Sequence, residues 1–588
     1  MANTSLRIGG NKWAVKEDNL LGYNIIQNKY VPIEMDAVRA TTATRVNENG
    51  LIEVVPRNLL TYSEQFDNAS WGKTNTTITS NTEVAPNGTN TADSFIPNTT
   101  SAQHYLSKNY GSGIIPTSSS TYSIYAKANG QNWLFLYVAS STPATSAYFN
   151  LSTGTVGTNT SGSNATIQDA GNGWFKCSIT HNVSGSTVVT ETHSSLSGTT
   201  LNYTGNGVDG IYIWGAQLEA NSVATDYFPT TDRLNIPRID YSSGTPSLLV
   251  EPQRTNLALR SEEFDNVAWT KQNCTITANS INSPNGTTTA DSLIASNGTA
   301  TFKGLYFNEL TIAPKTFSFY VKKGNKDWAM LLGYNGTNNC WFNISNGTLG
   351  TVGSNFLNAN IESVGDGWYR CYATLNSSVT ALGNLGIYFS DSDNSTSCTG
   401  DGTSVSAYLW GAQLEAGSNA TSYIPTTSAS VTRNADVISK TNISGLIGQT
   451  EGTVFLNINS FQTNVNRYIS ISDGTSNNYV YLRYIDSSNQ IWFRIASNGV
   501  VGSVQTYTYT NPQDFIKTVI RYNNNSFDVF LNGVKIITSV GVNTLSGSIN
   551  QLKFSFPDNT KIFQGNTKNI ALYKTALTDQ ECINLTTI

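Results

Sequence analysis

Short runs in which hydrophobic and polar residues alternate recur along most of the chain, separated by turns rich in Gly, Asn and Ser. Two examples are the runs 122–127 (Tyr-Ser-Ile-Tyr-Ala-Lys) and 317–322 (Phe-Ser-Phe-Tyr-Val-Lys). A period of two is typical of strands with one buried face. Within the repeated modules no stretch has a capped helical pattern, and we expect a brief helical turn only at 576–581 near the end of the chain. We therefore predict an all-β protein built from tandem jelly-roll β-sandwiches, with a further sandwich at its C-terminal end.

The pattern contains a long internal repeat. Residues 213–219 and 409–415 both contain Trp-Gly-Ala-Gln-Leu-Glu, and each copy is followed by Tyr-x-Pro-Thr-Thr. Upstream matches include Phe66 with Phe264, and Cys177 with Cys371 after Gly-x-Gly-Trp. A repeat of this length indicates one structural unit used twice. We place the first module at 57–232 and the second at 253–428, and expect the two cysteines to fill equivalent buried strand positions.

Three kinds of segment surround the modules. Connectors lie at 233–252, where prolines stiffen the chain, and at 429–444. Residues 445–588 alternate again and include Asn532-Gly533, a strong hairpin signal, so we expect an independent sandwich there. Residues 1–56 have too few apolar residues for a core of their own. We expect them to dock on another protein, with packing on the first module as the alternative.

Composition narrows the functional classes. The chain has 588 residues, is 11% aromatic and only 12% charged, and carries a net charge of -5. This charge argues against nucleic-acid binding, which needs a basic face. No apolar run is long enough for membrane insertion. The six cysteines form no Cys-x-x-Cys pair. We expect reduced thiols and a cytoplasmic site of folding, with a disulfide among Cys340, Cys371 and Cys398 as the alternative.

Several motifs resemble a known family. They are Arg254-Thr255-Asn256-Leu257, the segment 261–266 with Trp269, Gly367-Trp368-Tyr369-Arg370, and the Trp-Gly-Ala-Gln-Leu-Glu repeat. Together they resemble a module of tailed-bacteriophage fibre and appendage proteins that is similar to carbohydrate-binding jelly rolls. Residues 445–588 are similar to concanavalin A-like or laminin-G-like lectin domains, chiefly through Arg521-Tyr522, the segment 528–533 and the segment 570–573.

The resemblance implies a virion protein of the head or tail fibre type, assembled in the bacterial host cytoplasm. Its partners would be other virion proteins (capsid, portal or tail), bound through residues 1–56, and host-surface polysaccharide. A homo-oligomer is expected, with a trimer as the common form in such families. Two alternatives stay open. One is a purely structural capsid or tail component that binds no glycan, and the other is a polysaccharide depolymerase.

The sequence offers little enzymatic chemistry. Its histidines, His104, His181 and His193, lack the paired spacing of a zinc site, and no nucleophile elbow or phosphate-binding loop occurs. Hydrolysis of glycans needs two carboxylates placed across a cleft, and the acids of 445–588 are scattered. We therefore predict a binding protein and no enzyme.

Candidate site residues follow from residue type. Saccharides bind to aromatic faces with amide and carboxylate partners, and calcium binds to grouped oxygen ligands. For each group the alternative is an ordinary structural role. No cofactor other than a possible structural Ca²⁺ is expected. The carbohydrate-binding candidates are Asp473, Asn477, Asn478, Tyr479 and Trp492; the calcium candidates are Asp391, Asp393 and Asp401; the virion-anchoring candidates are Arg7, Trp13, Tyr23 and Tyr30.

Overall fold

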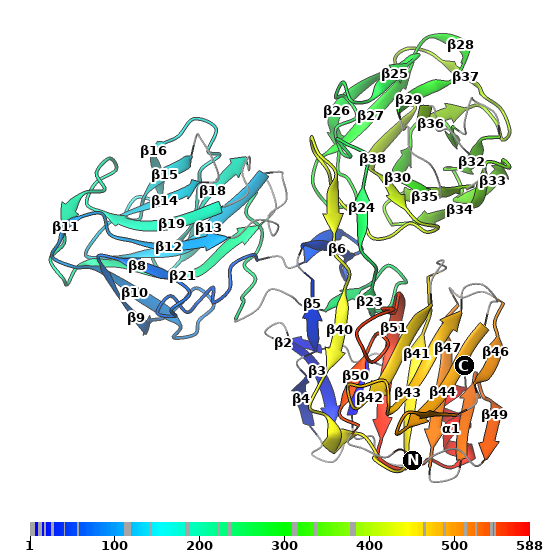
Figure 1. Cartoon of the computed structure of the whole chain (residues 1–588). Coiled ribbons are helices and arrows are strands. Elements are labelled where there is room, and N and C mark those ends of the chain that lie inside the picture. Colours follow the sequence, from blue (N-terminus) through cyan, green and yellow to red (C-terminus); the bar gives the residue numbers. More distant parts are fainter. Residues whose placement is uncertain are drawn as a thin grey trace. The chain divides into compact units, whose positions relative to one another are not determined.

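A computed structural model shows a protein built almost entirely of strands (Figure 1), which confirms the predicted all-β class. No described helix is long and apolar enough to cross a membrane. The structure describes residues 6–9, 14–16, 19–24, 29–33, 35–39, 41–55, 58–110, 119–139, 144–182, 188–219, 223–231, 237–308, 315–332, 338–376, 384–461, 466–485, 490–502, 504–510, 514–523, 526–540, 545 and 549–587.

The chain forms two compact units. One contains residues 40–42 and 54–236, and therefore the first module; the other contains residues 1–39, 43–53 and 237–588. The second unit thus joins the second module, the first connector from residue 237 onward, the second connector, the C-terminal sandwich and most of the N-terminal segment. This grouping differs from the six separate segments that the sequence pattern suggested.

The first module is a sandwich of two six-stranded sheets around a buried apolar core that includes Phe66, Trp71 and Leu134. One sheet runs in the order β9 (Thr76–Glu83), β10 (Ala92–Pro97), β21 (Gly210–Glu219), β13 (Ser119–Asn129), β18 (Trp174–Asn182) and β17 (Thr166–Gly171). The other runs β8 (Gly72–Thr74), β12 (Tyr105–Tyr110), β19 (Val188–Ser195), β14 (Trp133–Ala139), β15 (Thr145–Asn150) and β16 (Thr155–Asn159), and the pair β11 (Ser101–Ala102) and β20 (Tyr203–Thr204) lies apart.

The second module repeats this strand order. Its first sheet runs β26 (Cys274–Ile281), β27 (Ala290–Ala295), β38 (Ala407–Ala416), β30 (Lys315–Lys323), β35 (Trp368–Leu375) and β34 (Phe356–Ser363). The second runs β25 (Thr270–Gln272), β29 (Lys303–Asn308), β36 (Asn384–Ser390), β31 (Trp328–Leu331), β32 (Cys340–Asn343) and β33 (Thr348–Val352), with β28 (Gly298–Thr301) and β37 (Ser397–Gly400) as the small pair. Cys177 in β18 and Cys371 in β35 are fully buried at the same place, as predicted, and all six thiols are free.

The repeated Trp-Gly-Ala-Gln-Leu-Glu segment forms the central strand β38, and β21 in the first module. A β-bulge interrupts the pairing with β30, and Gly411 adopts the left-handed conformation (φ +63°) that such bulges favour in glycine. Beyond the bulge, the Gln413 amide donates to Glu415 (2.8 Å) and its carbonyl accepts from the Ile424 backbone (2.6 Å). The motif therefore fixes the exit of the chain from the sandwich, which is a structural role.

The C-terminal sandwich has an eleven-stranded and an eight-stranded sheet around a core that includes Ile8, Leu482 and Ile570. The larger sheet contains β1 (Leu6–Gly9), β2 (Ala14–Lys16), β3 (Asn19–Asn24), β4 (Lys29–Ile33), β22 (Arg238–Asp240), β23 (Ser247–Val250), β41 (Gly452–Ile458), β47 (Ile516–Tyr522), β48 (Ser526–Leu531), β49 (Val534–Val540) and β51 (Gly565–Tyr573). The smaller contains β5 (Asp36–Val38), β40 (Val437–Lys440), β42 (Arg467–Ser472), β43 (Tyr479–Ile485), β44 (Gln490–Ser497), β45 (Val500–Val501), β46 (Gln505–Thr508) and β50 (Gln551–Lys553).

Shorter elements complete this unit. Helix α1 begins with a capping box between Thr578 and Glu581, and its buried Cys582 packs with Phe455 and Phe530 on the larger sheet. The remaining elements are the hairpin β6 (Ala43–Val46) and β7 (Ile52–Val55), the pair β24 (Arg254–Asn256) and β39 (Val431–Arg433), the 3-10 turn η2 (Ser444–Leu446) and α1 (Asp579–Thr586).

The N-terminal segment is part of the C-terminal sandwich. Strand β1 pairs antiparallel with β51 over residues 6–9, and β5 pairs with β40 in the other sheet. The connector strand β23 also pairs with β51. The expectation of an independent sandwich at 445–588 is therefore corrected: strands from three distant parts of the sequence complete its sheets. An edge strand left unpaired would expose backbone donors and acceptors, which explains why these segments bind there.

A buried ionic cluster joins the N-terminal segment to both connectors. Arg238 and Arg433 bind the Glu251 carboxylate at 2.8 and 2.7 Å, while Arg39 binds Asp436 at 2.6 Å. Arg238 also binds Asp436, so one chain of contacts links all five side chains. Burial raises the pKa of Glu251, but the charges of Arg433 and Arg238 outweigh it and lower that pKa to about 2. The carboxylate is thus ionised throughout the physiological range.

Candidate pocket between the second module and the C-terminal sandwich

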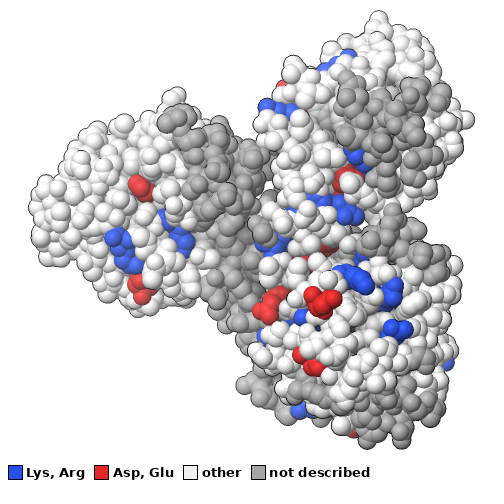
Figure 2. Space-filling view, viewed as in Figure 1, with Lys and Arg blue, Asp and Glu red and all other residues white. Residues whose placement is uncertain are grey.

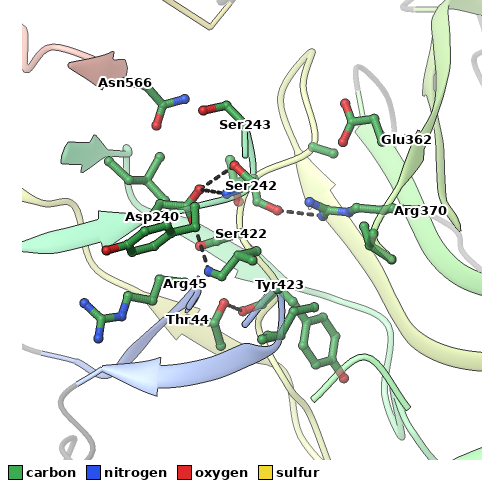
Figure 3. Close-up of a pocket in the computed structure, with 18 of the residues that line it drawn as sticks. Thr44, Arg45, Asp240, Ser242, Ser243, Glu362, Arg370, Ser422, Tyr423 and Asn566 are labelled. Carbon is green, nitrogen blue, oxygen red and sulfur yellow. Dashed lines mark hydrogen bonds between the residues drawn. The ribbon is translucent and has the colours of Figure 1, made fainter. Parts of the chain in front are cut away.

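The described residues of the second unit enclose a pocket of about 560 Å³ (Figure 3). Its wall contains the hairpin β6–β7, the connector 240–251, Tyr320 of β30, strands β34 and β35, the loop 420–423, and two loops and strand β51 of the C-terminal sandwich. Pockets that bind small ligands have a comparable size and often lie where domains meet. The ionic cluster holds this wall in place, because Glu251 accepts hydrogen bonds from the Ser422 backbone (2.7 Å) and hydroxyl (2.6 Å).

Two charged side chains come from the second module. Glu362 of β34 and Arg370 of β35 are cross-strand partners and lie on the same side of the pocket in Figure 3. Arg370 donates to the Thr421 carbonyl (2.6 Å) and the Ser318 hydroxyl (3.1 Å), and its guanidinium stacks over the Tyr320 ring at 5.4 Å. Its buried Nε has no hydrogen-bond partner among the described residues. The arginine is therefore held by stacking and two bonds, with donor capacity left over.

The Glu362 carboxylate is exposed and accepts hydrogen bonds from Asn360 (3.1 Å) and Tyr372 (3.3 Å). Burial, with the negative charge of Glu362 beside it, raises the pKa of Tyr372 to about 12. The tyrosine hydroxyl consequently keeps its proton at neutral pH. Among the described residues, Asn360 and Tyr372 are the two hydrogen-bond donors to Glu362, so the exposed carboxylate keeps lone pairs open to a ligand hydroxyl.

The connector supplies the opposite side. Asp240 accepts from the backbone N–H groups of Val46 (2.8 Å) and Ser242 (2.9 Å), so this carboxylate is fixed by backbone groups. Ser243 is exposed at the rim, and Asn566 lies beside it (Figure 3). The wall also contains half-buried aromatic side chains: Tyr241, Tyr372, Phe461 and Phe515. Hydroxyl-binding polar groups next to aromatic surface suit a polyhydroxylated ligand.

The predicted carbohydrate-binding residues do not form one site. Asp473 accepts from Thr475 (2.8 Å) and Asn478 (2.8 Å) and so shapes its own turn, while Asn477 is exposed there. Tyr479 is buried and packs with Tyr481. Trp492 lies further along the hairpin, because it pairs with Arg483 whereas Tyr479 pairs with Ala496. The sequence clustered these residues by turn composition, and the strand register separates them.

The predicted calcium residues also have separate partners. Asp391 binds Lys326 at 2.6 Å, and Asp393 accepts from the Thr351 backbone at 2.9 Å. Asp401 accepts from the backbone N–H groups of residues 403 and 404 at 2.8 and 2.7 Å, within its own turn. Throughout the described ranges, no group of three or more His, Cys, Asp or Glu side chains is placed to hold a metal ion. The three carboxylates stabilise loops.

Three of the predicted anchoring residues occupy one row of the larger sheet. Arg7 in β1 is the register partner of Tyr23 in β3, which in turn pairs with Tyr30 in β4. Arg7 is exposed. Trp13 lies outside the described residues. The row continues into the C-terminal sandwich through the pairing of Arg7 with Ala571.

Sequence reasoning missed the pocket because its wall comes from segments far apart in the chain. Glu362 and Arg370 lie in a strand, turn and strand motif whose first-module equivalent ends in Gly171-Asn172-Gly173-Trp174. One local signal was available. Arg370 follows Gly367-Trp368-Tyr369, and the equivalent position of the first module is Lys176, so both modules have a charged residue here within a hydrophobic strand. A charged side chain at such a position needs a polar environment.

No protein-family model matches the chain, and no curated protein matches it in sequence. Solved structures with partial similarity include the Ruminococcus gnavus IT-sialidase CBM40 bound to α2,3-sialyllactose, with 15% identity, a TM-score of 0.22, and coverage of 25% of this chain and 91% of that chain. Domain 4 of AbnA, a GH43 extracellular arabinanase from Geobacillus stearothermophilus in complex with arabinotriose, has 13% identity, a TM-score of 0.23, and coverage of 29% and 83%. The botulinum neurotoxin type G receptor-binding domain has 11% identity, a TM-score of 0.20, and coverage of 25% and 39%.

Proposed function

We propose that this protein is a non-enzymatic, glycan-binding appendage of a bacteriophage virion, of the head or tail fibre type. The observation that carries the glycan-binding part is the pocket beside Glu362 and Arg370. It combines a carboxylate, a guanidinium and hydroxyl donors with half-buried aromatic rings. The phage assignment rests on the sequence motifs of the modules and connectors.

The pocket favours binding over hydrolysis. A glycosidase needs one carboxylic acid that is protonated near neutral pH beside a second, ionised carboxylate. Glu251, one of the acids in the pocket wall, has its pKa lowered to about 2 by Arg433 and Arg238 against the effect of burial, so it remains ionised. Asp240 is bonded to backbone amides. Glu251 and Asp240 thus stabilise the wall, which leaves Glu362 as the single exposed carboxylate among the described lining residues.

Attachment to the particle belongs to the same proposal. The N-terminal strands β1 to β4 extend the larger sheet of the C-terminal sandwich. We infer that the virion partner contacts this sheet extension, with exposed Arg7 as part of the contact. Charge reversal by Arg7→Glu in the full chain is expected to lower incorporation into particles while the purified protein stays folded. Normal incorporation would count against this contact.

Glycan binding is tested with the purified full chain on a glycan array, followed by titration of each hit. Glu362→Gln removes the charge and half of the acceptor capacity, and we expect at least a tenfold loss of affinity. Glu263→Gln is the matched control, because Glu263 lies in the same module and pairs with Arg260 away from the pocket. Equal affinity of the Glu362→Gln variant would exclude this pocket as the site. Absence of any hit would favour a purely structural virion protein.

A further inference from the structure

A second surface with unbalanced charge lies on the outer face of the eight-stranded sheet. Alternation along β43 and β44 buries Leu482 and Phe493 in the core, so their neighbours Arg483 and Trp492 face outward. The register places Arg483 opposite Trp492, and Arg494 opposite Tyr481. In Figure 2, the visible face of the C-terminal sandwich carries Lys and Arg side chains together with several Asp and Glu side chains.

Aromatic rings hold the first arginine. The Arg483 guanidinium lies 4.7 Å from the centroid of the Trp492 ring and 5.3 Å from that of Tyr468. The Trp492 ring is itself positioned by a hydrogen bond from its Nε1 to Gln490 (3.0 Å). Stacking between two rings fixes a planar guanidinium without using its N–H donors. The terminal N–H groups of Arg483 are thus held in a defined plane in which they could bind a ligand.

The second arginine is close to the first. Arg494 pairs with Tyr481, two residues before Arg483 on the same strand, so the two arginines are diagonal neighbours. Lys561 adds a third cation, with its amine 5.7 Å from the Tyr468 ring centroid. Like charges this close repel each other unless a counter-charge is present. A bound anion would reduce the electrostatic repulsion between these three cationic side chains.

Within the described part of the chain, no Asp or Glu forms an ion pair with Arg483 or Arg494, and the buried Nε of each has no hydrogen-bond partner. Asp558 lies in the turn that precedes Lys561; hydrogen bonds from Thr560 (2.9 Å from the backbone N–H) and the charge of Lys561 lower its pKa, so it partly offsets the Lys561 cation but forms no ion pair with either arginine among the described residues. The imbalance occurs in a chain whose net charge is -5. A cationic surface is therefore a local feature.

We propose that Arg483, Arg494 and Lys561, together with the Trp492 ring, form a binding site for an acidic polysaccharide whose sugars carry carboxylates. A guanidinium binds a carboxylate through two parallel hydrogen bonds. The half-buried indole beside it offers apolar surface to the sugar ring. This second surface is separate from the pocket beside Glu362, so the inference does not depend on the ligand of that pocket.

The test uses the full chain and three polymers: polygalacturonate as the carboxylated probe, dextran as the neutral probe and dextran sulfate as a differently charged probe. We expect binding of polygalacturonate that weakens with added salt, and no binding of dextran. Arg483→Gln with Arg494→Gln is expected to weaken polygalacturonate binding at least tenfold. The matched control is Lys322→Gln with Lys323→Gln, which removes one half-buried and one exposed cation from the second module and is expected to leave binding unchanged.

The outcomes separate this inference from others. Equal losses in the arginine and lysine double variants would overturn the site, because they would indicate a response to net charge alone. Tighter binding of dextran sulfate than of polygalacturonate would overturn the carboxylate assignment. Should the arginine double variant unfold, as judged by circular dichroism, Arg494→Gln alone serves, with an expected loss of at least threefold. Glu362→Gln is expected to leave polygalacturonate binding unchanged. A failure of the pocket proposal can therefore be told apart from a failure of the arginine site.

Discussion

Ile8 lies directly opposite Ile570, and both side chains are buried in the core of the C-terminal sandwich. One residue comes from β1 and the other from β51, so the two ends of the described chain meet in a single sheet. The pairing continues through Leu6 with Leu572 and Gly9 with Asn569. The sandwich therefore depends on the N-terminal segment both for backbone hydrogen bonds and for apolar burial.

Truncation of Ile8 to alanine tests this dependence. Removal of a fully buried isoleucine side chain costs about 2–5 kcal/mol of unfolding free energy, because a cavity replaces packed methyl groups. We expect the urea midpoint of the second unit to fall accordingly. Arg7→Ala in the same strand is the control, since Arg7 is exposed and its loss should change stability little. An unchanged midpoint for Ile8→Ala would mean that β1 does not contribute to the core.

A fragment of residues 445–588 is expected to fold poorly by itself. It lacks β1 and β23, which pair with successive parts of one edge of β51, and β40 and β5, which extend the other sheet. Exposed strand edges promote aggregation. Size-exclusion chromatography and dye binding to exposed apolar surface should therefore show a non-native fragment. A monomeric fragment with a cooperative unfolding transition would contradict the prediction.

Acid should destabilise the second unit through Glu251. The folded pKa of about 2 lies below the ordinary value of 4.5, so the ionised carboxylate stabilises the fold above about pH 4.5. This stability, on the order of 3 kcal/mol, is lost as the pH falls from about 4.5 towards 2. Melting temperatures measured across this range should fall steeply for the natural protein.

Glu251→Gln should flatten that acid profile. The variant loses a charge between Arg238 and Arg433, so we also expect a lower melting temperature at pH 7, because breaking a buried ion pair costs about 3–5 kcal/mol. Glu53→Gln serves as control, since its pair with Arg45 is less buried. An equally steep acid profile in Glu251→Gln would assign the dependence to other carboxylates.

Glu262 should have the opposite pH dependence. Burial raises its pKa to about 7, and its carboxyl group accepts from Tyr423 (3.0 Å). The folded state then binds more protons than the unfolded state between about pH 4.5 and 7, so stability decreases as the pH rises through this range. Glu262→Gln is expected to melt a few degrees higher than the natural protein at pH 8 and at the same temperature at pH 4. A lower melting temperature at pH 8 would refute the raised pKa.

The repeat made the modules predictable from sequence. Alternation identified β13 and β30, and the Trp-Gly-Ala-Gln-Leu-Glu motif marked the central strands β21 and β38, because these patterns are local. The place of β1 was not predictable, since pairing across the whole chain leaves no local signal. The pocket was missed for the same reason: Glu362, Ser243 and Asn566 meet only after the sheets have assembled. Among the predicted carbohydrate-binding residues, the strand register places Tyr479 and Trp492 at different positions along the hairpin, which the sequence pattern did not indicate.

The pairing of β1 with β51 has a consequence for biosynthesis. A ribosome makes Leu6 long before its partner Leu572, so the larger sheet of the C-terminal sandwich can close only when translation is nearly complete. The first module has all its strands between β8 and β21 and can fold while the chain is still growing. A chain that terminates before β51 therefore leaves β1 without its partner strand.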